Sequence, residues 1–134
     1  MSHGLRSLSI VLLLSWAAAT SAGEEPLPSV WEQAQARGVV LRAIGNEPGW
    51  LLEIDAGDRA LLLTDYGAWR RTFTVSVNGD ADGMEFTATV DGKPLHATFT
   101  PASCSDTMSD RTYPLRVTVT LGDQAFHGCG VDLR

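Results

Sequence analysis

Residues 85–99 read E-F-T-A-T-V-D-G-K-P-L-H-A-T-F, and this stretch carries the pattern that decides the fold. Apolar and polar side chains alternate on both sides of the dipeptide Asp91-Gly92. That dipeptide favours a two-residue type I′ turn, in which both central residues need a positive φ. With this turn Ala88 would pair with Leu95, and both strands would place their apolar side chains on one face. The stretch therefore predicts a tight β-hairpin.

The same alternation recurs before and after this hairpin. A second hairpin is predicted around Gly122-Asp123, and it aligns with the first. The alignment is either an internal repeat or the result of two hairpins that follow the same rules, and we favour the latter. Further strands, each ended by Gly, Pro, Asn or Asp, are predicted at residues 39–44, 50–55, 60–64 and 70–77. In the last of these strands we expect Phe73, Val75 and Val77 to face inward.

About eight short strands with close turns indicate an all-β protein, either a small antiparallel β-barrel or a sandwich. We favour the barrel, because closure of the sheet removes exposed edges. A short helix is predicted over residues 30–37, with a capping box from Ser29 and Glu32 and a stop at Gly38. We expect this helix to lie across one end of the domain.

The first residues have the composition of a secretory signal peptide. A weakly basic start with Arg6 precedes the apolar run 8–19, and small residues follow. Cleavage is predicted after Ala22, with Ala19 as the alternative. The apolar run is short for a transmembrane span, and no lipid-acceptor cysteine follows it. We therefore expect a periplasmic or secreted protein without a transmembrane anchor.

The predicted organisation is a signal peptide over residues 1–22, a leader with the short helix over 23–38, and one β-barrel domain over 39–134. Removal of the first 22 of the 134 residues would leave 112, which suits a single domain and a monomer. The net charge is −6, and loss of Arg6 would make it −7. This sign argues against nucleic acids and anionic membranes as partners.

The chain has two cysteines, Cys104 and Cys129, and in an exported protein they predict a disulfide. Closing the loop between them would restrict the unfolded chain by roughly 3.5 kcal/mol. A redox or metal pair is the alternative. The absence of a C-x-x-C motif and of ligand-like histidine spacing argues against it.

The loop that follows Cys104 concentrates charged and hydroxyl side chains. Asp106, Asp110 and Arg111 suggest a turn network held by ion pairs, since Asp and Ser bond their own backbone in turns. A Ca²⁺ site and a recognition surface are the alternatives. No metal and no cofactor are predicted.

A second polar loop, G-N-E-P-G-W over 45–50, offers an amide, a carboxylate and an aromatic ring in Asn46, Glu47 and Trp50. This set suits a sugar or another polar ligand with an apolar face. Trp50 is nevertheless expected in the core, because it shares the strand face of Leu52 and Ile54, opposite Glu53. His96 and His127 are expected on the surface.

Three segments carry a resemblance: G-N-E-P-G-W at 45–50, C-S-D-T-M-S-D-R-T-Y-P at 104–114, and Gly128-Cys129. Together they resemble a family of small, largely uncharacterised bacterial envelope proteins, whose domains also occur near META-type (HslJ-like) and lysozyme-inhibitor modules. Thr107 stands where the family pattern has glycine. The resemblance implies an envelope location and a compact β-fold, and it assigns no activity.

The sequence therefore favours a non-enzymatic envelope module that binds a small molecule, a glycan or an envelope protein. Its predicted recognition residues are Asn46, Glu47, Asp106, Asp110 and Arg111. The first alternative is an inhibitor that inserts residues 103–111 into the cleft of a cell-wall enzyme such as lysozyme. The second is a hydrolase, for example a glycosidase that uses Glu47 with Asp106 or Asp110. No G-x-S-x-G or H-E-x-x-H motif supports this second alternative.

Overall fold

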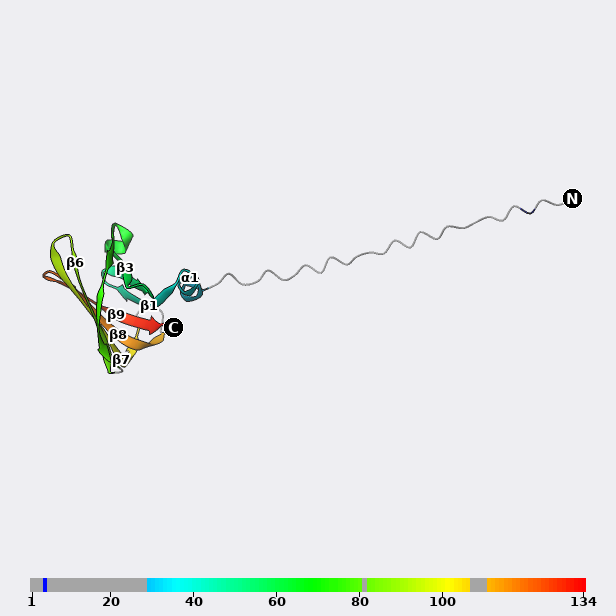
Figure 1. Ribbon diagram of the computed structural model, residues 1–134. Helices are drawn as coiled ribbons and strands as arrows, with labels where there is room; N and C mark the ends of the chain where they lie inside the picture. Colours follow the sequence, from blue (N-terminus) through cyan, green and yellow to red (C-terminus); the bar gives the residue numbers. More distant parts are fainter. Residues whose placement is uncertain (1–3, 5–28, 81, 107–110) are drawn as a thin grey trace.

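The computed structural model describes residues 4, 29–80, 82–106 and 111–134. These residues form a nearly closed antiparallel β-barrel with one short helix (Figure 1). The predicted barrel is therefore confirmed, with nine strands in the described ranges rather than about eight. The elements are α1 (Val30–Ala36), β1 (Val39–Asn46), β2 (Gly49–Asp55), β3 (Arg59–Thr64), the 3-10 turn η1 (Asp65–Gly67), β4 (Trp69–Thr74), β5 (Ser76–Asp80), β6 (Gly83–Val90), β7 (Lys93–Ser105), β8 (Thr112–Leu121) and β9 (Gln124–Asp132).

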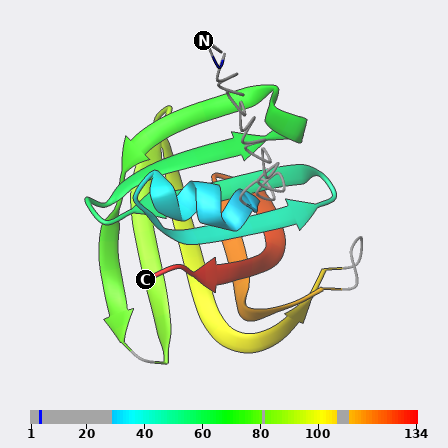
Figure 2. The ribbon, with the colours of Figure 1, turned by 90° about the vertical axis from the view of Figure 1, so that its right-hand side faces the viewer.

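The barrel closes where one predicted strand bends. The strand order is β4-β3-β2-β1-β9-β8-β7-β6-β5, so the two edge strands are consecutive in the chain. The chain bends between them at Val75, whose N–H donates to the carbonyl oxygen of Asp58 at 2.8 Å. Residues before the bend pair with β3, and residues after it pair with β6. The two edges of the sheet are thus joined through the chain itself (Figure 2).

The bend also corrects the prediction for residues 70–77. They do not form one strand, and only part of the expected inward face is buried. Val75 is 4% exposed and lies in the core, whereas Val77 is 50% exposed. Val77 pairs with Phe86, but β5 has a hydrogen-bonded neighbour on one side only, so no further strand covers it. The predicted burial of Val77 is therefore wrong.

The predicted hairpin over 85–99 is confirmed residue by residue. Ala88 pairs with Leu95, and Asp91 and Gly92 have φ values of 52° and 76°, as the type I′ turn requires. Side chains from all around the barrel fill its interior. The largest fully buried ones are Phe99, Leu41, Leu52, Ile54, Leu62, Leu95, Val117 and Val119.

Outside the barrel, α1 packs beside β1 and completes a second apolar cluster. Ser29 and Glu32 form the predicted capping box, and the helix ends at Ala36, one residue earlier than predicted. The ring of Trp31 lies 5.4 Å from that of Tyr113. Ile44, Val131 and the two cysteines belong to the same cluster.

The disulfide Cys104–Cys129 is formed as predicted, with a Cα–Cα distance of 5.6 Å. Because β8 lies between β7 and β9 in the sheet, the bridge spans a strand. Apart from Gly4, the predicted signal peptide lies outside the described residues. Within the ranges described, no helix is long and apolar enough to cross a membrane.

A candidate binding cleft beside the disulfide

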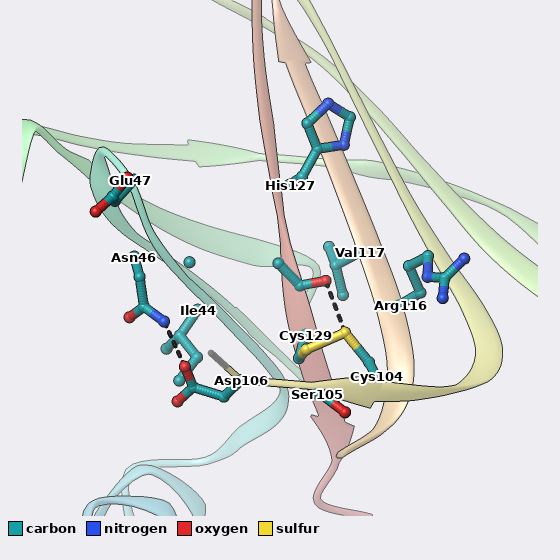
Figure 3. Close-up of a pocket in the computed structure, with 12 residues that line it drawn as sticks. Ile44, Asn46, Glu47, Cys104, Ser105, Asp106, Arg116, Val117, His127 and Cys129 are labelled. Carbon is teal, nitrogen blue, oxygen red and sulfur yellow. Dashed lines mark hydrogen bonds between the residues drawn. A yellow bond between two sulfur atoms is a disulfide. The ribbon is translucent and has the colours of Figure 1, made fainter. Parts of the chain in front are cut away.

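A cleft of about 390 Å³ opens on the outer surface beside the disulfide (Figure 3). The end of β1 and the turn after it form one side, and the end of β7 with the middle of β8 and β9 forms the rest. Its volume lies near the lower end of the range of about 300–1,000 Å³ usual for small-molecule sites.

Three of the predicted recognition residues meet on one side of this cleft: Asn46, Glu47 and Asp106 (Figure 3). The amide nitrogen of Asn46 donates to the carboxylate of Asp106, although 60 residues separate them. Asp106 is only 9% exposed, while Glu47 is exposed and available to a ligand. The structure thus joins the two polar loops that the sequence singled out.

The remaining predicted site residues have different positions. Arg111 is exposed and does not line the cleft. Its backbone carbonyl accepts a hydrogen bond from the N–H of Asp106 at 2.8 Å, which closes the base of the intervening loop. Asp110 lies outside the described residues, as does Thr107. The Ca²⁺ hypothesis for Asp106 and Asp110 therefore stays a prediction. In the part of the chain described, no three His, Cys, Asp or Glu side chains gather closely enough to hold a metal ion.

The disulfide borders the middle of the cleft, between the side with Asn46 and the side with His127 (Figure 3). The Sγ atom of Cys104 lies 3.4 Å from the carbonyl oxygen of Gly128. Since the bridge ties β7 to β9, it fixes the spacing of the strands that carry the lining residues.

Arg116 and His127 line the other side, and the sequence reasoning did not select them. His127 is exposed, as predicted, and its Nδ1 lies 3.4 Å from the hydroxyl oxygen of Thr118. A signal for both residues was present in the strand pattern. Arg116 pairs with Cys129, and His127 lies two residues before it, so all three point to the same outer face.

The G-N-E-P-G-W motif has a packing role in addition to its polar one. Trp50 is 5% exposed and belongs to the core, so the expectation for this residue is confirmed. Its Nε1 donates to the carbonyl oxygen of His127 at 3.2 Å. A Cβ on Gly45 would lie 1.9 Å from this Nε1, and one on Gly128 would lie 2.8 Å from Cζ2 of the same ring. Both motif glycines therefore make room for the indole.

Comparison of the chain with models of protein families, with curated protein sequences and with solved structures gave no match. The resemblance to envelope proteins rests on the three sequence motifs and stays a prediction.

Proposed function

We propose that this chain is a non-enzymatic binding module of the bacterial envelope, located in the periplasm, whose cleft beside the disulfide holds a small polar ligand. The observation that supports this most directly is the convergence of Asn46, Glu47 and Asp106 from two distant loops. These side chains stay together only if both loops are held in place. The hydrogen bond between Asn46 and Asp106 and the disulfide hold them there. A preorganised site loses less conformational entropy on binding.

The charges around the cleft indicate the chemistry of the ligand. Glu47 and Asp106 lie on one side, and Arg116 and His127 lie on the other (Figure 3). A ligand with a donor or cationic group at one end and an acceptor or anionic group at the other would complement both sides. Amino acids and short peptides have this character. We therefore favour a small amphoteric molecule over a neutral or purely anionic one for this cleft.

Binding rather than catalysis is supported by the role of Asp106. Its carboxylate is buried and accepts a hydrogen bond from Asn46, and its N–H anchors the loop base. These contacts are typical of a residue that holds a binding site in shape. A glycosidase would need one carboxylate as the acid and the other as nucleophile or base.

Native mass spectrometry of the protein purified without denaturation tests this proposal. We expect a reproducible excess mass that is retained in Glu85→Ala and lost in Glu47→Ala and His127→Ala. Glu85 provides the matched control, because its side chain is 54% exposed and does not line the cleft. All three substitutions are at exposed positions and should change the free energy of unfolding by no more than about 0.5 kcal/mol. A bare mass for the wild-type protein would count against a small ligand.

The inhibitor hypothesis remains the second candidate, because the base of the loop over residues 103–111 is held at several points. Cys104 is fixed by the disulfide, and Asp106 bonds to both Asn46 and Arg111. A lysozyme assay on bacterial cell walls, with and without excess protein, tests it. Unchanged lysis at a large molar excess would reject lysozyme as the target.

A further inference from the structure

A second cavity, of about 370 Å³, lies at the end of the barrel where four turns meet. These are the turns after β1, β3, β6 and β8, and residues of these turns or of the strand ends beside them line the cavity. In Figure 1 the β6–β7 turn and the connection after β3 both stand at the upper end of the barrel. We call this cavity the barrel mouth. The β1–β2 turn separates it from the cleft, since Glu47 lines the cleft and Pro48 lines the mouth.

Apolar side chains line part of the barrel mouth, and one wall carries an aromatic ring. Val90, Leu121 and Phe126 are each at most 5% exposed and belong to the core. Trp69 is half-buried and lines the cavity. The guanidinium of Arg71 stacks 4.8 Å from the centre of the Trp69 ring and also bonds to Asp91, at 2.9 Å. The indole is thereby held in place at the wall.

The residue after Asp65, Tyr66, has an exposed aromatic ring and an unusual backbone conformation. Asp65, Tyr66 and Gly67 have φ values of 52°, 53° and 88°, and left-handed conformations are costly for the two non-glycine residues. Tyr66 is 77% exposed, although tyrosine is on average partly buried. A Cβ on Gly49 would lie 2.5 Å from the Tyr66 ring, so the glycine leaves space for the ring beside Pro48.

We propose that the barrel mouth binds a neutral saccharide, at a site separate from the cleft. The C–H face of a sugar ring is apolar and packs on aromatic side chains. Trp69 lines the mouth, and Tyr66 follows the lining residue Asp65 in the chain. Its hydroxyl groups are donors and acceptors, and Asp65 and Gln124 bring a carboxylate and an amide to the same opening. A strained backbone that keeps an aromatic ring exposed is typical of a ligand-binding position.

The charge of the molecule narrows the class of saccharide. The chain carries a net charge of −6, and two aspartates line the mouth against one lysine, Lys93. An anionic glycan would be repelled by this field, whereas a neutral one would not. The site therefore favours neutral sugars over uronates.

An NMR titration of the ¹⁵N-labelled protein with maltotriose, cellotriose and chitotriose tests the proposal. We expect at least one of them to shift the Trp69 indole signal and the backbone amides of 65–67 in a saturable manner. The Trp31 indole on α1 serves as the remote reference. Tyr66→Ala and Asp65→Asn should weaken this binding by at least about ten-fold, which corresponds to the loss of one aromatic contact or one hydrogen bond. Trigalacturonate should bind more weakly than the neutral sugars.

Val77→Ala is the control variant, because Val77 is also an exposed apolar residue but lies outside the barrel mouth. It should bind like the wild-type protein, and a dispersed spectrum for each variant shows that it is folded. Absence of saturable shifts with all three neutral sugars would overturn the proposal. So would shifts centred on Asn46 and His127 in the cleft, or a Tyr66→Ala variant that binds as well as the wild-type protein.

Discussion

Gly45 faces the indole of Trp50 across the β1–β2 hairpin, where the two residues pair. A Cβ at this position would lie 1.9 Å from Trp50 Nε1 and 2.7 Å from the carbonyl oxygen of His127. Neither neighbour moves easily, because Trp50 is buried and the carbonyl belongs to β9. The glycine is therefore required by packing between strands.

Gly45→Ala should destabilise the protein by about 3 kcal/mol, since overpacking a well-filled core forces neighbouring groups to shift. Urea unfolding followed by tryptophan fluorescence measures this. Gly57→Ala is the matched control, because the nearest atom to its Cβ would be Asp55 Oδ1 at 3.4 Å. Equal unfolding midpoints for the two variants would contradict the packing role of Gly45.

Glu53 was expected on the strand face opposite Trp50. That position by itself would leave its side chain exposed to solvent. Its side chain is instead 6% exposed, because two arginines cover it. Arg37 lies 2.8 Å and Arg42 3.0 Å from its carboxylate. Arg42 also stacks 4.6 Å from the centre of the Trp31 ring. A buried carboxylate therefore links β2 to β1 and to the end of α1.

Glu53→Gln should lower the free energy of unfolding by about 3 kcal/mol, because it leaves the largely buried guanidinium of Arg42 without its counter-charge. The same substitution at Glu85 is the control. Glu85 pairs with His96 at 3.7 Å, and both side chains are about half exposed. Surface pairs of this kind contribute between about 0 and 1 kcal/mol. Chemical denaturation of both variants at neutral pH should show a large loss of stability for Glu53→Gln and a small one for Glu85→Gln.

At the scale of the element, the helix α1 begins at its capping box and is stabilised by the packing of the Trp31 ring on the barrel. A helix of seven residues is too short to be stable alone in water. Trp31 packs on Tyr113 and under Arg42, and the Gln35 amide donates to the carbonyl oxygen of Leu133 at 2.8 Å. The capping box therefore starts the helix, and contacts with the barrel stabilise it.

Trp31→Ala should cost about 2 kcal/mol, as part of a large apolar contact and a cation–π interaction are lost together. Val30→Ala provides the control on the same helix, because Val30 is 56% exposed. Thermal unfolding by circular dichroism would show a lower melting temperature for Trp31→Ala alone. If both variants melt together, α1 does not contribute through Trp31.

For the whole molecule, closure depends on the bent segment that joins β4 to β5. The two edge strands each have a hydrogen-bonded neighbour on one side only, whereas β8 is paired along most of its length with β7 and β9. The Arg71–Asp91 pair connects β4 to the β6–β7 turn at 2.9 Å, but both side chains are exposed to solvent. The seam between β4 and β6 is therefore the weakest line in the barrel.

Hydrogen exchange measured by mass spectrometry should reflect this order. Amides of β4 and β5 should exchange first and those of β7 and β8 last, because local opening is easiest where few strands hold a segment. Arg71→Ala should speed exchange in β4 while leaving β8 unchanged. Uniform protection across all strands would show that the barrel opens only as a unit.

Local patterns in the sequence determined the strands, the hairpin register at Asp91-Gly92, the capping box and the disulfide. Each depends on residues that are close in the chain or on a single possible pairing. The approach of Asn46 to Asp106 was anticipated only as a juxtaposition of two loops. Tertiary structure decided three other features: His127 and Arg116 line the cleft, Glu53 is buried, and residues 70–77 divide at Val75. The bend at Val75 follows from barrel closure, the cleft from the pairing of β1 with β9, and the burial of Glu53 from the approach of Arg37 and Arg42. Each depends on contacts between segments that local sequence patterns do not specify.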